Sequence, residues 1–150
     1  MSYAIRRAIA EDLAAIEACV QAAYAIYVER IGREPAPMLA DYHALSARGV
    51  VYVLAEQDGV HGVLVMMRQG DSMFVENIAV DPRFQGQGLG RMLMAFAEQQ
   101  AHLANLIEIR LYTNELMTEN LQFYRRLGFE EEGRSTQDGY RRVFLRRRLT

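Results

Sequence analysis

The sequence predicts an α/β fold in which strands and helices alternate along the chain. Short runs rich in Val, Ile and Tyr are typical of strands, and between them apolar residues recur every three or four positions, as on amphipathic helices. Two turn signals, Asp58-Gly59 and Asp138-Gly139, each separate two such strands and predict β-hairpins. Together these signals give the element order β-α-α-β-β-β-α-β-α-β-β, with about seven strands and about four helices.

The first third of the chain supplies one strand and two helices. Glu11 and Asp12 precede a run of apolar residues at helical spacing, and Gly32 ends that run. Two prolines follow, and proline cannot continue a helix because it lacks the backbone donor and fixes φ. The expected elements are a strand over Tyr3–Ile9, a helix that starts at Leu13 and stops at Gly32, and a second helix over Met38–Ala47.

The rest of the chain alternates strands with two further helices, the last of which stops at Gly128. The expected strands cover Val50–Glu56, Val60–Arg68, Met73–Val80, Leu106–Thr113, Phe129–Ser135 and Tyr140–Leu149. The expected helices cover Leu89–Leu103 and Met117–Leu127. Helical spacing in the first of them predicts a buried side made of Leu89, Met92, Leu93, Phe96 and Ala97.

Composition narrows the class of protein. A chain of 150 residues, 51% hydrophobic and 24% charged, is expected to form one soluble domain over residues 1–150. The net charge of -2 gives no general reason to expect a nucleic-acid or membrane partner. No apolar leader or membrane-length apolar run is present, so the cytoplasm is the expected location. Cys19 is the only cysteine, which excludes a disulfide within the chain.

The most informative stretch joins the strand that ends at Val80 to the helix that starts at Leu89. It contains glycines at positions 86, 88 and 90. A helix N-terminus presents unpaired N–H groups and the positive end of the helix dipole, and glycine lets an anion approach the backbone closely. The stretch therefore predicts a phosphate site, with a merely flexible loop as the alternative.

Spacing excludes two common kinds of phosphate site. A dinucleotide fingerprint, G-x-G-x-x-G, requires its third glycine one place later than Gly90. A P-loop requires Gly-Lys-Ser/Thr, and this chain contains no lysine. The pattern that remains is Gln85-x-x-Gly88-x-Gly90.

This pattern resembles the acetyl-coenzyme A signature, Q/R-x-x-G-x-G/A, of the GNAT family of N-acetyltransferases. The resemblance continues through Asn120-Leu-Gln-Phe-Tyr-Arg-Arg-Leu-Gly-Phe129, which is similar to the late helix and following strand of the family, and it covers the chain from about Tyr52 onward. The stretch Arg30–Tyr42 is similar to bacterial members of unassigned substrate. The resemblance implies the GNAT fold, in which a mixed and strongly twisted sheet is flanked by helices.

The resemblance also implies acetyl-coenzyme A as cosubstrate, without a metal. The glycine loop would hold the pyrophosphate through backbone N–H groups, and the end of the preceding strand would pair with the pantetheine arm as an added strand does. A free N–H of that strand would hold the thioester oxygen as it becomes an oxyanion. The residues expected to bind the cofactor are Ile78, Ala79, Val80, Gln85, Gly86, Gln87, Gly88, Leu89, Gly90, Arg91, Asn120 and Phe123.

Two residues are candidates for the chemistry. Tyr124 fits the family's general acid, which would give a proton to the departing thiolate, although an aromatic residue there is also typical of a core. Many members carry asparagine seven residues before this tyrosine, where this chain has Met117. Glu76 is the candidate base, and strand periodicity places it on a face with Phe74, Ile78 and Val80. A structural ion pair is the alternative for Glu76, and Glu108, Tyr112 or an ordered water remain open as bases.

The wall that faces the acceptor is expected from the first helices. Tyr27, Arg30, Met38 and Tyr42 are candidates, with Tyr140, and core packing explains the tyrosines nearly as well. His43, His61 and His102 fit no metal-ligand spacing and are expected at the surface or in turns.

The sequence thus predicts an N-acetyltransferase that moves an acetyl group directly from the thioester to a primary amine. A non-catalytic acyl-coenzyme A sensor on the same fold is the alternative. The arginine-rich tail suggests a nucleic-acid-binding module, but no aromatic residues alternate with the arginines, and an edge strand with solvated or paired arginines explains them. The acceptor is expected to be a small-molecule or peptide amine, and the sequence leaves a homodimer open.

Overall fold

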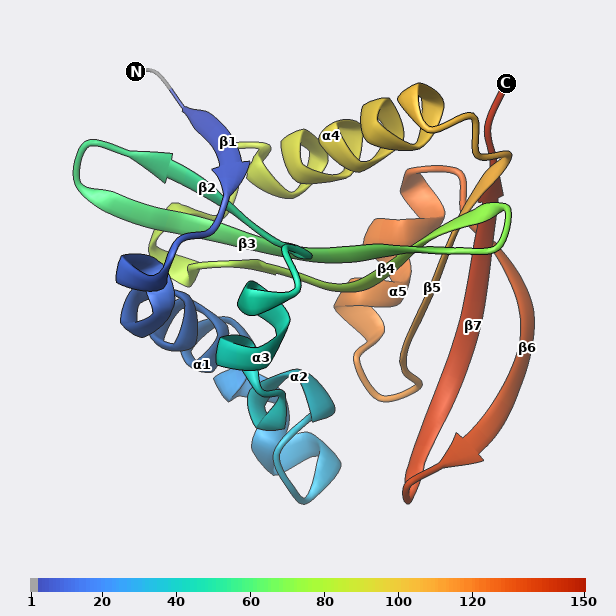
Figure 1. The fold of residues 1–150 in the computed structure, drawn as a ribbon. Helices are drawn as coiled ribbons and strands as arrows, with labels where there is room; N and C mark the ends of the chain where they lie inside the picture. The colour runs from blue at the N-terminus through green and yellow to red at the C-terminus, as the bar shows by residue number, and fades with distance from the viewer. Residues whose placement is uncertain (1–2) are drawn as a thin grey trace.

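The computed structural model describes residues 3–150, which form one seven-stranded sheet with helices on both faces (Figure 1). The strand order is β1-β2-β3-β4-β5-β7-β6. The strands are β1 (Ala4–Arg7), β2 (Val51–Glu56), β3 (Gly59–Gln69), β4 (Ser72–Val80), β5 (Glu108–Asn114), β6 (Glu130–Gln137) and β7 (Tyr140–Arg148). The α-helices are α1 (Leu13–Ile31), α2 (Ala36–Leu39), α3 (Tyr42–Ala47), α4 (Leu89–Leu103) and α5 (Thr118–Arg126).

The sheet is mixed, as predicted, and the parallel pair formed by β4 and β5 creates a gap. Strands β4 and β5 run parallel and pair only from Ser72 with Glu108 to Val75 with Leu111. Beyond this point β4 continues to Val80 and β5 to Asn114 without pairing to each other. Every other neighbouring pair is antiparallel. The open side of β4 after Val75 is therefore available for other contacts.

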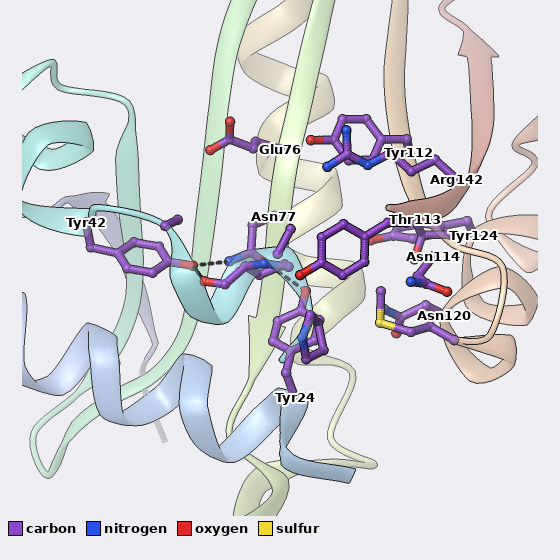
Figure 2. Close-up of a pocket in the computed structure, with 16 residues that line it drawn as sticks. Tyr24, Tyr42, Glu76, Asn77, Tyr112, Thr113, Asn114, Asn120, Tyr124 and Arg142 are labelled. Atoms are coloured by element: carbon purple, nitrogen blue, oxygen red, sulfur yellow. Dashed lines mark hydrogen bonds between the residues drawn. The ribbon is translucent and has the colours of Figure 1, made fainter. Parts of the chain in front are cut away.

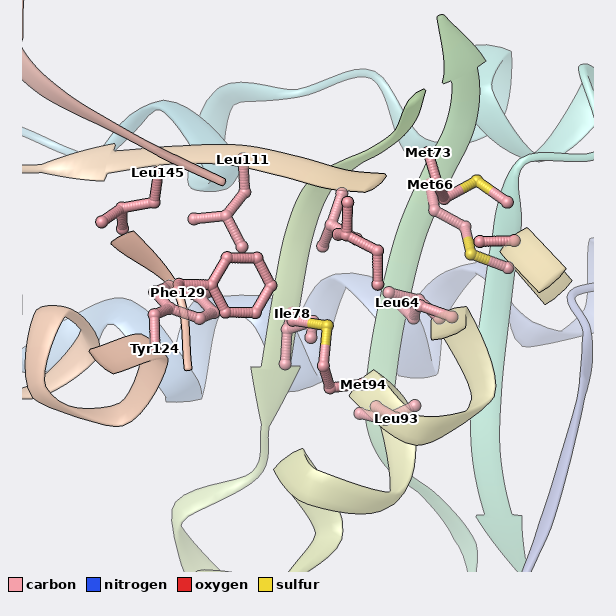
Figure 3. Packing of buried hydrophobic residues seen from close by; sticks show 14 of the residues in the cluster. Leu64, Met66, Met73, Ile78, Leu93, Met94, Leu111, Tyr124, Phe129 and Leu145 are labelled. Carbon is pink, nitrogen blue, oxygen red and sulfur yellow. The ribbon is translucent and has the colours of Figure 1, made fainter. Parts of the chain in front are cut away.

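Each face of the sheet buries its own apolar cluster. Helices α4 and α5 cover one face, and α1, α2 and α3 cover the other. Leu93 of α4 is fully buried in the first cluster (Figure 3), where burial of such a side chain contributes about 1.5–3 kcal/mol. Gly62 of β3 allows this contact, because a Cβ there would lie 3.0 Å from a methyl carbon of Leu93. The sheet is therefore held between two layers of helices.

The predicted helix over Met38–Ala47 is wrong in one respect, since the chain forms two short helices there. The backbone is extended at Ala40, between α2 and α3. The Asp41 side chain accepts a hydrogen bond from the N–H of Ala44 and so caps α3, and the Tyr42 hydroxyl donates to the Pro37 carbonyl at 2.5 Å. These two contacts favour a corner over a continuous helix, and they raise the number of α-helices within residues 3–150 to five.

Strand periodicity failed at Glu76 because β4 contains a bulge. Val65 of β3 pairs with Asn77, whereas Met66 pairs with Val75, so Glu76 is the extra residue. Ile78 packs in the cluster under α4 and α5 together with Val75. The prediction that Glu76 shares a face with Ile78 is therefore wrong.

Two further expectations about burial and position are wrong. Met92 is 38% exposed, whereas Met94 on the same helix is buried. The arginine-rich strand β7 is not at the edge of the sheet, because it lies between β5 and β6. Several of its arginines are paired, among them Arg147, which lies 2.8 Å from Glu98.

Within residues 3–150, no helix is long and apolar enough to cross a membrane.

Candidate active site

The glycine loop joins β4 to α4 through a tight turn. The Asp81 side chain accepts a hydrogen bond from the N–H of Arg83 and starts a short 3₁₀ turn over Pro82–Phe84. Gly86 and Gly88 then adopt left-handed backbone angles, with φ of 83° and 79°, which glycine adopts without strain. Gly88 precedes the first turn of α4, and no side chain caps that turn. The first N–H groups of α4 are thus left available for an anion.

A groove of about 520 Å³ runs along this loop, the end of β4 and the facing sides of α1 and α5. Gly90 brings α4 and α5 together beside it, since a Cβ there would lie 3.0 Å from the Phe123 ring. Gln87 does not line the groove, and its side-chain oxygen accepts a hydrogen bond from the Tyr3 hydroxyl at 3.1 Å. The other residues expected at the cofactor line it: Ile78, Ala79, Val80, Gln85, Gly86, Gly88, Leu89, Gly90, Arg91, Asn120 and Phe123.

The backbone of β4 presents free polar groups to this groove. The N–H of Asp81 donates to the His61 carbonyl at 2.9 Å, which sets the alternation of the β3–β4 ladder. In an antiparallel ladder, alternate residues direct both backbone groups away from the partner strand, and here these are Ile78 and Val80. The Tyr24 hydroxyl lies 3.1 Å from the Ile78 carbonyl on that side. The N–H groups of Ile78 and Val80 therefore face the groove.

A second, smaller cavity of about 140 Å³ lies at the gap between β4 and β5 (Figure 2). Its walls come from α1, the segment around α2, α3, β4, β5, α5 and β7. Tyr24, Asn120 and Tyr124 line both this cavity and the groove. The two hollows therefore meet at these three side chains.

Tyr124 is both a core residue and a residue of this junction. It is 6% exposed, and its ring packs against Phe129 and Phe123, with ring centroids 5.8 Å and 5.3 Å apart. Burial raises the pKa of the Tyr124 hydroxyl well above its usual value. Among the described residues, that hydroxyl has no hydrogen-bond partner, which leaves it free for a ligand.

Glu76 lies in the wall of the small cavity. Burial raises the pKa of its carboxyl above the usual value, and the charge of Arg48 offsets part of this effect. No arginine or histidine of residues 3–150 forms an ion pair with it. Among the alternatives, Glu108 lies outside both hollows and holds Arg110 at 2.8 Å, whereas Tyr112 lines the small cavity.

Sequence reasoning missed the hydrogen-bond network behind Glu76. The Tyr24 hydroxyl lies 2.5 Å from Asn77 Oδ1, and the amide nitrogen of Asn77 donates to the Tyr42 hydroxyl at 2.9 Å (Figure 2). This network ties α1, α3 and β4 together. The polar pair Glu76-Asn77 inside an apolar strand was the signal that could have revealed it.

The residues expected at the acceptor wall fall into three places. Tyr42 lines the small cavity, as does Tyr140, whereas Tyr27 lines the groove. Met38 lines neither hollow. Arg30 also lies outside both, where its guanidinium is 2.6 Å from Glu119 and lowers the pKa of that carboxyl to about 2.

The prediction that His61 lies at the surface or in a turn is wrong, because this residue is buried in β3, with 2% of its surface exposed. Its ring stacks on Phe84 at 3.5 Å between centroids, and Nε2 lies 2.7 Å from an oxygen of Asp58. With Glu56, these residues place three potential metal ligands within 4.8 Å of one another. The Asp58 side chain is exposed, and its hydrogen bond with His61 accounts for the geometry without an ion.

Comparisons with known proteins agree with this architecture. Residues 47–131 match the family model described as Acetyltransferase (GNAT) domain. Mycothiol acetyltransferase of Kocuria rhizophila is 35% identical in an alignment 91 positions long, which covers 55% of this chain and 30% of that protein. The chain thus spans under a third of the length of this curated relative.

Two solved structures share the fold over nearly the whole chain. The ribosomal-protein-S18-alanine N-acetyltransferase of Escherichia coli superposes with a TM-score of 0.78 at 19% identity, covering 99% of this chain and 95% of that one. PaiA N-acetyltransferase of Thermoplasma acidophilum, solved in complex with coenzyme A, gives a TM-score of 0.81 at 16% identity, covering 99% and 100%. The mixed sheet with its flanking helices is therefore a fold that known N-acetyltransferases adopt.

Proposed function

This chain belongs to the GNAT acetyltransferase family, and from that premise we propose that it transfers the acetyl group of acetyl-coenzyme A directly to a primary amine. The observation that carries the proposal is the meeting of the two hollows at Tyr24, Asn120 and Tyr124. A thioester that follows the groove and an amine that enters the small cavity would come together at this junction.

The groove suits coenzyme A in three respects. The first turn of α4 offers uncapped N–H groups for the pyrophosphate, with Arg91 and Arg126 beside them. The free side of β4 at Ile78 and Val80 offers hydrogen bonds to the amides of the pantetheine arm. One of these N–H groups would also hold the thioester oxygen as it becomes negative during attack.

The reaction requires two proton movements. The amine nitrogen attacks the thioester carbon, the bond from carbon to sulfur breaks, and the thiolate leaves. Glu76 would accept the proton of the ammonium, directly or through water, and its raised pKa makes it a better base than an ordinary glutamate. Tyr124 would stabilise and protonate the thiolate.

The raised pKa of Tyr124 limits what this residue contributes. A thiol has a pKa near 8.5 and a phenol near 10, so proton transfer from tyrosine to thiolate is uphill even before burial is considered. Burial raises the tyrosine pKa further and keeps the hydroxyl protonated. Tyr124 would therefore act mainly by donating a hydrogen bond, with a contribution at the low end of the usual ~10²–10⁴-fold.

The acceptor in this proposal is a small molecule or a peptide with a primary amine, and the cytoplasm is the proposed location. The test is a screen of primary amines with acetyl-coenzyme A, in which released thiol is measured for the wild type and for Tyr124→Phe. We expect thiol release that depends on the amine and an acetylated product identified by mass. Tight coenzyme A binding without transfer to any amine would contradict the proposal and favour an acyl-coenzyme A sensor.

A further inference from the structure

Two opposite charges line the small cavity, and neither forms an ion pair with another of the described residues. On β7, Arg141, Arg146 and Arg147 each lie within 4.0 Å of a carboxylate, whereas Arg142 forms no ion pair with any described residue. Glu76 is likewise unpaired within residues 3–150. Figure 2 shows Glu76 on the β4 side of the cavity and Arg142 with Tyr112 on the opposite side. An unpaired carboxylate and an unpaired guanidinium thus face one cavity.

Arg142 is held in place by contacts that leave donors free. One of its terminal nitrogens donates to the Gln137 side chain at 2.8 Å, and its guanidinium carbon lies 4.2 Å from the centroid of the Tyr112 ring. Stacking uses the face of the guanidinium and leaves its edge available. Arginine has five N–H donors, so most remain for a ligand.

Two further polar groups that line the cavity lack partners among the described residues. Asn114 pairs directly with Arg142 in the register of β5 and β7, so both side chains lie on one face of the sheet. The Asn114 oxygen accepts from the N–H of Leu116 at 2.9 Å, which leaves its amide N–H groups free. Thr113 also lines the cavity, and its hydroxyl is buried without a hydrogen-bond partner in the described part of the chain. A buried hydroxyl of this kind needs a hydrogen-bond partner, which a ligand or a water would supply.

The walls of the cavity limit the size of its occupant. The Tyr140 hydroxyl donates to the Glu34 carbonyl at 2.6 Å, and the Arg33 guanidinium lies 3.6 Å above the Tyr140 ring. These contacts fix the segment before α2 against the β6–β7 hairpin. A volume of about 140 Å³ is close to that of an engineered cavity of about 150 Å³ that holds benzene. The cavity therefore suits a small molecule or one residue of a chain.

We propose that the acceptor is a primary amine that also carries a carboxylate, with its amino group at Glu76 and its carboxylate bound by Arg142 and Asn114. The inference rests on the proposed acetyl transfer and names its substrate class. Planar guanidinium and carboxylate groups form paired hydrogen bonds, which makes Arg142 a specificity-determining residue. The carboxylate comes from a free amino acid or from an acidic side chain at the N-terminus of a peptide.

The test compares acceptors that differ only in the carboxylate. Glycine is compared with glycinamide, β-alanine with its amide, and a tripeptide amide that begins with Asp with one that begins with Asn. We expect kcat/KM to be about tenfold or more higher for the acid of at least one pair, because hydrogen bonds to charged groups are the strong ones. The pair that discriminates identifies the source of the carboxylate.

Variants assign the discrimination to Arg142. Arg142→Gln should bring the acid-to-amide ratio close to one, whereas the matched control Arg141→Gln should retain the wild-type ratio. Equal rates for acids and amides in the wild type would overturn this inference and leave acetyl transfer intact. Retention of the ratio in Arg142→Gln would overturn it as well. Failure of every amine would contradict the proposed function itself.

Discussion

The groove and the small cavity differ in the kind of group that would contact the ligand. In the groove, the ligand contacts we propose come from backbone N–H groups, positioned by the glycine loop and by the open side of β4 after Val75. In the small cavity the proposed ligand contacts come from side chains. These side chains belong to residues far apart in the sequence, such as Tyr24 and Arg142, that line the same cavity. The backbone site therefore depends on local conformation, whereas the side-chain site depends on the assembly of the whole fold.

This difference suits the two ligands. A cofactor shared by a family requires the same contacts in every member, and backbone groups provide them whatever side chains surround the loop. An acceptor that differs between members requires contacts that can change without disturbing the fold. Side chains around the gap, such as Glu76 and Arg142, provide that freedom. Variants should therefore separate cofactor binding from acceptor use.

The largest effect is expected at the junction of the two hollows. Tyr124→Phe removes the hydroxyl and keeps the ring in its contacts with Phe123 and Phe129. We expect kcat to fall about 100-fold, at the low end of acid catalysis, with little change in coenzyme A affinity. Steady-state kinetics and calorimetry measure the two quantities. If turnover is unchanged and only the melting temperature falls, Tyr124 is a core residue alone.

The next effect concerns the groove alone. Gly88→Asp places a negative charge beside the proposed pyrophosphate position and strains a backbone with φ of 79°. We expect coenzyme A affinity to fall about tenfold or more, which corresponds to at least about 1.4 kcal/mol. Gly70→Asp is the matched control, because Gly70 also has positive φ and lies outside both hollows. Equal affinities in the two variants would place the phosphate elsewhere.

A smaller effect is expected for the base. Glu76→Gln should lower kcat/KM at neutral pH, and less at high pH, where more of the amine is already unprotonated. Burial raises the Glu76 pKa, and the carboxylate is the active form. The wild-type acid limb should therefore lie above the usual glutamate value and disappear in the variant. Profiles that differ by a constant factor at every pH would mean that Glu76 positions groups without moving protons.

The smallest effect is expected in the network behind the cavity. Tyr42→Phe removes the hydroxyl that contacts Asn77 and Pro37. We expect KM for the amine to rise about threefold, since a neutral hydrogen bond contributes about 0.5–1.5 kcal/mol, while KM for acetyl-coenzyme A stays constant. Tyr52→Phe, outside both hollows, is the control. A parallel change of both KM values would indicate a general loss of structure.

Local signals predicted most of the fold. Gly32 ends α1 with φ of 88°, as expected from a glycine after an apolar helical run. Asp58-Gly59 lies at the turn between β2 and β3, which pair as the predicted hairpin. Most errors arose where contacts between distant segments decide the structure. The burial of His61 depends on its stacking against Phe84. The corner at Ala40 is an exception, because it depends on the contact between Tyr42 and Pro37, which lie only five residues apart. The internal position of β7 depends on strand order, which the sequence order does not reveal.

The same reasoning explains what could be foreseen of the site. The glycine loop was found because its spacing encodes its backbone conformation. The meeting of Tyr24, Asn77 and Tyr42 could not be found, because it joins three elements through tertiary packing. The bulge at Glu76 also hid the side of the strand on which that carboxylate lies, since alternation assumes a regular ladder.

The most direct test of the account is a crystal structure of the protein with coenzyme A. The account predicts the pyrophosphate at the first N–H groups of α4 and the pantetheine arm along Ile78 and Val80. It also predicts the sulfur atom beside the Tyr124 hydroxyl, within hydrogen-bonding reach of it. A cofactor outside the groove, or a sulfur atom far from Tyr124 with its arm away from β4, would contradict the claim that the two hollows meet at the reaction centre.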